Sequence, residues 1–299
     1  MNSNRQTSLI IPAYNEEKGV PLVIEEYLDK VDEIIVVDDG STDKTFEVAK
    51  KYDVKLYKHE TNRGKVAALR TGVEHATCDI IIFTDADFTY PAKYVPDLVK
   101  EIEKGADLVL GARIENIKNM PLLNKIGNHI FSFLATYIGC ITVTDSQTGY
   151  RAFKREMFDK LHVNAKSLEF ETKMTVRAAK LGYKIVEIPI EYRERVGKSK
   201  LRPIRDGIKM FFALGSIAFS ETSLLAKMII APSLFFLLVG LIIGFIAIYE
   251  KIVFGVLTHE YYPILTAFLI LIAIQLISFG LIVDFLTKKL DRIEEKLLK

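Results

Sequence analysis

The 299-residue sequence contains no tryptophan and only two cysteines. Cys78 and Cys140 have none of the spacings at which cysteines bind a metal, so the cysteine pattern indicates no zinc site. The 40 basic and 38 acidic side chains nearly cancel and leave a formal net charge of +2. Proteins that bind nucleic acid through a broad surface carry a larger positive charge, and the sequence therefore argues against that class.

Charged residues are also missing from two long apolar runs, residues 228–249 and 261–283. A helix needs about 20 apolar residues to cross the hydrocarbon core of a bilayer, and both runs reach that length. The alternative is a pair of buried core helices. Soluble core helices seldom lack charge on all faces over such a length, so the runs predict two transmembrane helices.

Basic residues flank the two runs unevenly. The flanking cations are Arg202, Arg205, Lys209 and Lys227 before the first run and Lys288, Lys289, Arg292, Lys296 and Lys299 after the second. In the connector, residues 250–260, the only basic residues are one lysine and one histidine. Because cytoplasmic loops are enriched in Lys and Arg, this asymmetry predicts that both termini are cytoplasmic. Residues 1–8 are polar and show no signal-peptide pattern, so we expect the N-terminal region on the same side.

Up to about residue 195, short β-rich runs alternate with amphipathic helical patterns. The expected strands are residues 8–11, 33–37, 55–57, 80–84, 108–111 and 185–190. The expected helices are residues 20–30, 45–51, 66–75, 94–104 and 167–181. This alternation predicts an α/β fold whose mostly parallel sheet is covered on both faces.

Polar clusters follow three of the expected strands: PAYNEE at 12–17, DDGSTD at 38–43 and DAD at 85–87. Each alone fits an ordinary loop, and Ser41 or Thr42 would suit the cap of the helix expected from Thr45. Ligands of open parallel sheets bind beyond the carboxyl ends of the strands, where all three clusters converge. The set therefore predicts one binding site at that edge.

The chemistry of these clusters fits a nucleoside diphosphate. Asp85 and Asp87 suit a hard divalent cation, Mg²⁺ or Mn²⁺, which would also act as a Lewis acid on a departing diphosphate. Asp39 suits recognition of base and ribose, and Lys65 opens a helix whose N-terminal amides suit phosphate. There is no GxxxxGK[ST] pattern, so a P-loop ATPase is not indicated.

Residues 7–195 resemble family 2 glycosyltransferases with the GT-A fold. The resemblance is carried, in order, by IPAYNEE, VVDDGSTDKT, NRGKVAALRTG and FTDAD. Further motifs are similar to those of polyprenyl- or dolichyl-phosphate sugar synthases: GAR at 111–113, DSQTGYRAF at 145–153, EFET at 169–172 and GKSKL at 197–201. The resemblance implies a metal-dependent enzyme that transfers a hexose from a nucleoside-diphosphate sugar to polyprenyl phosphate at the membrane.

The same resemblance implies the roles of individual residues. The nucleotide sugar would contact Pro12, Tyr14, Glu16, Asp39, Lys65, Asp85 and Ala86, and the metal would be held by Asp85 and Asp87. The acceptor phosphate would meet Arg113, Lys125, Ser199 and Lys200, and the catalytic set would be Asp87, Arg113, Arg151 and Lys200. Two positions depart from the mannosyl enzymes: Thr89 stands where glutamine is common, and Lys125 where arginine is common.

An ionised lipid phosphate needs no general base, so the expected demand is for cations that bring two anionic groups together. The basic residues between Arg193 and Arg205 fit that demand, although positive-inside flanking alone would also explain them. In-line attack would invert the anomeric centre. Gln147 favours UDP-glucose or another UDP-sugar slightly over GDP-mannose.

Two other functions compete with this one. A chain-forming family 2 enzyme acting on another membrane-associated acceptor usually carries a QxxRW motif, which a chain without tryptophan lacks. A non-catalytic nucleotide-sugar-binding scaffold would tolerate loss of the intact DAD carboxylates.

The expected organisation has four parts. Residues 1–200 form the catalytic domain, 201–225 an interfacial amphipathic helix, 226–287 the two spans and 288–299 a basic cytoplasmic tail. A second segment, 121–138, has apolar residues at helical spacing and suits either the domain core or the membrane interface. The expected partners are the bilayer, the nucleotide sugar and the lipid phosphate, and the sequence leaves a homo-oligomer open.

Overall fold

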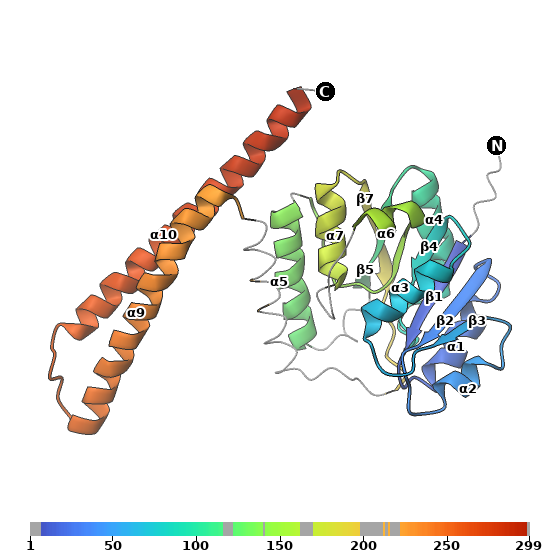
Figure 1. The fold of residues 1–299 in the computed structure, drawn as a ribbon, viewed down its shortest axis with the longest axis horizontal. Coiled ribbons are helices and arrows are strands. Elements are labelled where there is room, and N and C mark those ends of the chain that lie inside the picture. Colours follow the sequence, from blue (N-terminus) through green and yellow to red (C-terminus); the bar gives the residue numbers. More distant parts are fainter. Residues whose placement is uncertain are drawn as a thin grey trace. The chain divides into compact units, whose positions relative to one another are not determined.

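The computed structural model describes residues 7–115, 122–139, 141–161, 170–197, 212, 215 and 222–297. The chain divides into two compact units, residues 1–215 and 216–299, which we describe separately (Figure 1).

The first unit is built on a seven-stranded sheet with the order β3-β2-β1-β4-β6-β5-β7. The strands are β1 Thr7–Ala13, β2 Glu33–Asp38, β3 Lys55–Lys58, β4 Ile80–Phe83, β5 Leu108–Glu115, β6 Arg151–Lys154 and β7 Ile185–Glu191. All pairings are parallel except those of β6, which runs antiparallel to both β4 and β5. The predicted mostly parallel α/β sheet is confirmed, and all six expected strands are present. The seventh, β6, was not predicted as a strand.

Helices cover both faces of this sheet. They are α1 Gly19–Tyr27, α2 Thr45–Ala49, α3 Lys65–His75, α4 Val95–Glu103, α5 Leu122–Gly139, α6 Arg155–Leu161 and α7 Phe170–Lys180, with a short 3-10 turn at Ala92–Tyr94. Side chains of α1 and α4 pack with Leu9, Ile11 and Val36 on one face. The opposite face meets α3, where Gly72 lies directly against Ile10. Because both faces are covered, the central strands are apolar at successive positions rather than at alternate ones.

Helix α5 has one buried and one exposed apolar face. Phe131, Ala135 and Ile138 are buried, and the helix packs on α7. The exposed row consists of Leu122, Ile126, Ile130 and Phe133, each at least 50% exposed. The expected helix at 121–138 is therefore confirmed, with one face packed on the domain. The interfacial amphipathic helix expected at 201–225 lies mostly outside the described residues.

The second unit is a hairpin of two long helices, α9 Leu224–Phe254 and α10 Tyr262–Leu297. Both are long and apolar enough to cross a membrane, and only 11% of each apolar stretch is buried within the protein. Three glycines allow the helices to approach: a Cβ at Gly280 would lie 2.6 Å from Ile230 Cγ1, one at Gly244 2.9 Å from Thr266 Cγ2, and one at Gly240 3.2 Å from Leu269 Cβ. Helix α9 begins after Ser223, whose side chain accepts a hydrogen bond from the Ala226 amide.

Packing of α3 on the sheet gives a direct test of this arrangement. A Cβ at Gly72 would lie 2.3 Å from Ile10 Cγ2, so Gly72→Val must push α3 away from β1. We expect it to lower the free energy of unfolding by about 1–3 kcal/mol, the usual cost of overpacking a core. Thermal unfolding of the detergent-solubilised protein, followed by near-UV circular dichroism, measures the change. The control is Glu74→Val, which places the same side chain at an exposed position of the same helix; equal losses in both variants would contradict this packing.

Candidate active site

The three polar clusters lie at the carboxyl ends of β1, β2 and β4, which are neighbours in the sheet. Hydrogen bonds join the first two clusters to each other. Asn15 has a left-handed backbone with φ of 52°, a conformation that asparagine tolerates. Its amide donates to Ser41 Oγ at 2.9 Å, and its side-chain oxygen accepts from the Thr42 amide at 2.8 Å. Ser41 and Thr42 do not cap α2: the residue at the N-cap is Lys44, so that expectation was wrong.

Asp39 is buried at the end of β2 and is surrounded by donors. Its carboxylate accepts from the backbone amides of Arg63 at 2.9 Å and Gly64 at 2.7 Å, and it lies 2.6 Å from His59 Nδ1. The other ring nitrogen of His59 lies 3.0 Å from Thr71 Oγ1. Asp39 therefore fixes the loop that leads into α3 by accepting hydrogen bonds from its backbone.

Asp85 follows β4 and pairs with Lys65, the first residue of α3. Lys65 Nζ lies 2.7 Å from Asp85 Oδ1 and 2.8 Å from Glu171 Oε1 of α7. Burial alone would raise the pKa of Asp85, but the charge and hydrogen bond of Lys65, together with the charges of Arg113 and Arg195, outweigh it and lower that pKa. Gly149 packs against this carboxylate, since a Cβ there would lie 2.7 Å from Asp85 Oδ2. Gly149 is itself fixed by its amide, which donates to Tyr90 Oη at 2.9 Å.

Asp87 is more deeply buried than Asp85 and is held from two sides. Thr89 donates to its Oδ1 from the backbone amide and from the hydroxyl, the latter at 2.6 Å. Arg195 bridges Asp87 Oδ2, at 3.3 Å, and Glu16 Oε1, at 2.6 Å. Burial and the neighbouring charge of Asp85 raise the pKa of Asp87. The two carboxylates of the DAD motif therefore lie close enough to repel each other.

Phe88, between Asp87 and Thr89, has a left-handed backbone with φ of 66°. A bulky residue rarely adopts this conformation, and holding it costs about 1–3 kcal/mol. Such strain is stable only when the surroundings fix the backbone from several sides. The loop that carries Asp87 is therefore held in place rather than relaxed.

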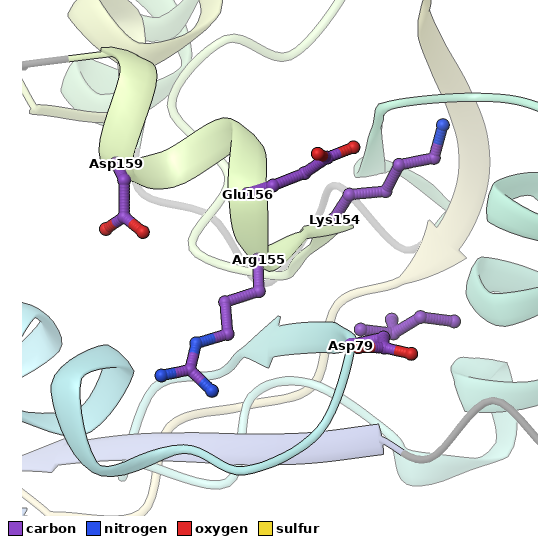
Figure 2. Close-up of a pocket in the computed structure, with 6 residues that line it drawn as sticks. Asp79, Lys154, Arg155, Glu156 and Asp159 are labelled. Carbon is purple, nitrogen blue, oxygen red and sulfur yellow. The ribbon is translucent and has the colours of Figure 1, made fainter.

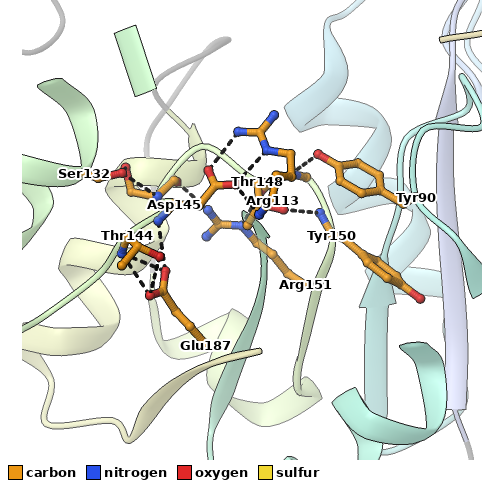
Figure 3. Close-up of polar contacts among 11 residues, drawn as sticks. Tyr90, Arg113, Ser132, Thr144, Asp145, Thr148, Tyr150, Arg151 and Glu187 are labelled. Carbon is orange, nitrogen blue, oxygen red and sulfur yellow. Dashed lines mark hydrogen bonds and ion pairs between the residues drawn. The ribbon is translucent and has the colours of Figure 1, made fainter. Parts of the chain in front are cut away.

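Arg113, at the end of β5, forms a two-pronged ion pair with Asp145 (Figure 3). Its Nε and one terminal nitrogen donate to the two carboxylate oxygens at 2.7 and 2.8 Å, and its guanidinium lies over the Tyr192 ring. Glu187 accepts from the backbone amides of Thr144 and Asp145 and so holds the loop from the far side. Among the described residues, the other terminal nitrogen of Arg113, Nη1, has no hydrogen-bond acceptor.

Arg151 has a different environment from Arg113. It is fully buried, and its guanidinium donates to the carbonyls of Ser146 and Thr148 and to Thr175 Oγ1. Burial lowers its pKa to about 10. Because the guanidinium is fully buried, a substrate could reach it only after the surrounding chain had moved. Arg151 thus fixes the loop at 146–148 from within the core, and the geometry departs from the direct catalytic contact expected from the sequence.

The remaining predicted residues are distributed around the same edge. Ala86 is buried against α1, where a Cβ at Gly19 would lie 2.1 Å from its carbonyl oxygen. Pro12 and Tyr14 are half-buried at the end of β1, and Lys125 is half-buried on α5. Ser199 and Lys200 lie outside the described residues. Sequence reasoning did not assign roles to Glu171, Asp145, Gly149 or Tyr90, although all four lie in or beside quoted motifs, and it placed Arg195 only in the general basic cluster between Arg193 and Arg205.

A cavity of about 520 Å³ lies at the opposite end of the sheet (Figure 2). It is lined by Asp79, Ile80, Lys154, Arg155, Glu156 and Asp159. Asp79 precedes β4, and Lys154 ends the antiparallel strand β6. This cavity is therefore remote from the carboxyl ends of the parallel strands, where the polar clusters meet.

Comparison with known proteins decides the family. The sequence profile of Glycosyl transferase family 2 matches residues 8–162. The chain belongs to glycosyltransferase family 2. A dolichyl-phosphate hexose transferase from Haloferax volcanii is 33% identical over 218 residues, covering 72% of this chain and 94% of that protein. A UDP-N-acetylglucosamine–dolichyl-phosphate N-acetylglucosaminyltransferase from Methanococcus voltae is 33% identical over 235 residues, covering 69% of this chain and 93% of that protein.

The fold agrees with this membership. Glucosyl-3-phosphoglycerate synthase from Mycobacterium tuberculosis, solved with Mn²⁺, UDP and phosphoglyceric acid, has a TM-score of 0.58 at 24% identity. The match covers 73% of this chain and 78% of that protein. The GT-A architecture expected from the sequence is therefore confirmed.

The DAD carboxylates fit a divalent cation. Within the described residues, no group of three or more His, Cys, Asp or Glu side chains surrounds a metal position. In nucleotide sites, however, Mg²⁺ takes one or two carboxylates and completes its shell with phosphates and water. Asp85 is 29% exposed and its charge disfavours ionisation of Asp87, so a cation beside both would relieve that repulsion. For this glycosyltransferase, a metal held jointly by Asp85, Asp87 and the donor is chemically reasonable.

The tight contact of Gly149 with Asp85 leads to a prediction. Gly149→Ala places a methyl group on the Asp85 carboxylate and must displace it. We expect nucleotide-sugar turnover, measured as release of nucleoside diphosphate, to fall about 100-fold, because a displacement of about 1 Å in a group that positions the reactants can cost that much in rate. Gly127→Ala is the control, since a Cβ at Gly127 meets nothing within 4 Å. Full activity of Gly149→Ala would show that Asp85 need not stay in place.

Proposed function

We propose that this chain transfers a hexose from a nucleoside-diphosphate sugar to a polyprenyl (dolichyl) phosphate and inverts the anomeric centre. The observation that carries the proposal is the meeting of paired carboxylates and cations at the ends of β1, β2 and β4, in a chain that also contains two apolar helices. The names of the two archaeal relatives, each a transferase acting on dolichyl phosphate, support it.

The donor nucleotide is proposed to bind along the ends of β1 and β2. Asp39 is an acceptor-only carboxylate fixed by two amides, which suits an N–H of the base or a ribose hydroxyl. The nucleoside would contact Pro12, Tyr14 and Glu16, and it would also lie against Ala86. The ammonium group of Lys65, which pairs with Asp85, would also interact with the donor diphosphate.

Asp85 and Asp87 would hold Mg²⁺ or Mn²⁺ with the donor diphosphate. The bound cation would supply Lewis acidity and neutralise charge on the leaving nucleoside diphosphate. Arg195 pairs with both Asp87 and Glu16, and it would occupy the side of the Asp87 carboxylate that faces away from the metal. The solved relative with Mn²⁺ and UDP supports this arrangement by analogy of fold.

The acceptor side is proposed to lie around Arg113. The phosphate oxygen of a lipid phosphate is already ionised, so the chain needs only to position it against the sugar carbon. Arg113 is fixed by Asp145 and retains one terminal nitrogen to donate to the phosphate. Lys125, Ser199 and Lys200 would complete the site, while Arg151 would act indirectly by fixing the loop at 146–148.

The membrane arrangement is proposed as follows. Residues 1–200 form the catalytic domain, 201–225 an interfacial helix, 226–287 two spans and 288–299 a basic tail, with both termini cytoplasmic. The exposed apolar row of α5 would lie in the headgroup region, which would bring Lys125 of the same helix to the lipid phosphates.

The donor sugar is best tested directly. We expect purified full-length protein, supplied with polyprenyl phosphate and Mn²⁺, to move label into the organic phase from one donor of a panel of UDP-glucose, UDP-N-acetylglucosamine and GDP-mannose. A UDP-sugar is expected, because Gln147 favours it and one relative is named for one. Asp87→Asn is expected to abolish transfer while leaving membrane extraction and the circular dichroism spectrum unchanged. Label that stays in the aqueous phase with every donor would reject the lipid-phosphate acceptor.

The role of Arg113 can be separated from that of a general surface cation. Arg113→Lys keeps a positive charge but loses the guanidinium group, which pairs with Asp145 through two nitrogens and leaves the third for a ligand. We expect kcat/KM for polyprenyl phosphate to fall about 100-fold with the affinity for UDP nearly unchanged. Arg155→Lys, at the opposite end of the sheet, is the matched control. An equal loss of UDP affinity in Arg113→Lys would overturn the acceptor role.

A further inference from the structure

The chain that leaves β7 runs alongside the loop that carries Asp87. The Arg193 amide donates to the Thr89 carbonyl at 3.1 Å, and the Val196 amide donates to the Asp87 carbonyl at 3.0 Å. These two bonds join residues about a hundred positions apart in the sequence. They bracket Phe88, the residue with the strained backbone. The strained loop is therefore fastened on one side by the segment after β7.

The side chain of Arg193 fastens the same loop to helix α1. Its two terminal nitrogens donate to Glu26 Oε2 at 2.8 Å and to Glu26 Oε1 at 3.0 Å. Its guanidinium also lies 4.9 Å from the centroid of the Phe88 ring. A two-pronged carboxylate pair made while the same cation lies over an aromatic ring is an arrangement that the forked arginine guanidinium provides and the single lysine ammonium does not. Glu26, Arg193 and Phe88 form a clamp, and we use that name for these three residues below.

Helix α1 supplies the other side of the clamp. Gly19, at its beginning, lies so close to Ala86 that a Cβ would be 2.1 Å from the Ala86 carbonyl oxygen. Glu26 also accepts from the Ala92 amide at 3.2 Å. Helix α1 thus contacts the chain just before Asp87 and again just after Thr89. A shift of Arg193 would release its contact with the Phe88 ring, which also packs against the apolar core.

We propose that Arg193 is a positioning residue for Asp87: the clamp holds Phe88 in its left-handed conformation and so keeps the Asp87 carboxylate in the orientation that binds the metal. The inference rests on the proposed function, because it assumes that Asp87 is a metal ligand. Arg193 touches no carboxylate of the DAD motif itself and acts through the backbone of its neighbour.

A nearby ion pair provides a matched comparison. Lys93 pairs with Glu191 at 2.8 Å and lies over the Tyr94 ring, so it too combines a carboxylate with an aromatic ring close to the same segment. Lys93 is 57% exposed, and within the described part of the chain it forms no hydrogen bond or ion pair with residues 87–89. Exposed pairs of this kind contribute little to stability. Loss of Lys93 removes a cation from the same region without releasing Phe88.

The experiment measures how much Mn²⁺ the full-length enzyme needs. Arg193→Ala, Arg193→Lys and Lys93→Ala are compared with the wild type at saturating UDP-sugar and polyprenyl phosphate. Direct Mn²⁺ binding in the presence of UDP is followed by electron paramagnetic resonance. We expect Arg193→Ala to raise the half-saturating Mn²⁺ concentration about 10- to 100-fold, as loss of outer-shell support does at metal sites. Arg193→Lys should raise it to an intermediate value, and Lys93→Ala should leave it unchanged.

The outcomes separate the inference from the function on which it rests. A merely structural Arg193 would lower the melting temperature and the amount of active enzyme but would leave the half-saturating Mn²⁺ concentration at the wild-type value. That result would overturn the clamp while Asp87→Asn still lost metal binding and the proposed function stood. Wild-type protein that binds Mn²⁺ no better than Asp87→Asn would overturn both. Where Arg193→Ala fails to fold, Arg193→Lys with wild-type Mn²⁺ dependence is the contradicting result.

Discussion

Compensation of negative charge at one edge of the sheet is the constraint on which the rest of the site depends. Burying an unpaired carboxylate costs several kcal/mol, so each acidic side chain at this edge requires a donor. The pairs are Asp39 with two amides and His59, Asp85 with Lys65, Asp87 with Arg195 and Thr89, and Asp145 with Arg113. The donors come from the segment between β3 and α3, from the first residue of α3, from the loop after β4, from the segment after β7 and from β5. Charge pairing therefore joins parts of the chain that the backbone hydrogen bonds of the sheet leave separate.

These cations differ in how firmly they are held, and the difference matches their proposed work. Arg113 is 11% exposed and locked by two parallel hydrogen bonds, which suits a fixed anchor for an anionic acceptor. Lys65 is 37% exposed and pairs through a single flexible ammonium. Arrival of a diphosphate and a divalent cation would supply new partners to both Asp85 and Lys65 at once. An exchange of partners is cheaper than breaking a pair, because no charge is left uncompensated at any stage.

The sequence predicted the fold well and the site in part, for reasons that particular residues make clear. Strands β1, β2 and β4 are buried on both faces, so unbroken apolar runs marked them, and the polar residues that follow marked the binding edge. Strand β6 is four residues long, and its first residue is a buried arginine, which no hydropathy pattern would place in a strand. The pairing of Lys65 with Glu171 joins residues more than a hundred positions apart, and only the tertiary fold brings them together.

Arg113 and Arg151 show most directly where sequence reasoning stops. Both stand in motifs shared with lipid-phosphate sugar synthases, and the pattern alone gives them equal standing. In the fold, β6 runs antiparallel between β4 and β5, which turns Arg151 into the interior beneath the loop at 146–148. Arg113 lies at the open end of β5, where one nitrogen remains for a ligand. Direction of the strand, rather than residue type, thus decides which arginine is buried beneath the loop at 146–148 and which one is proposed to meet the acceptor.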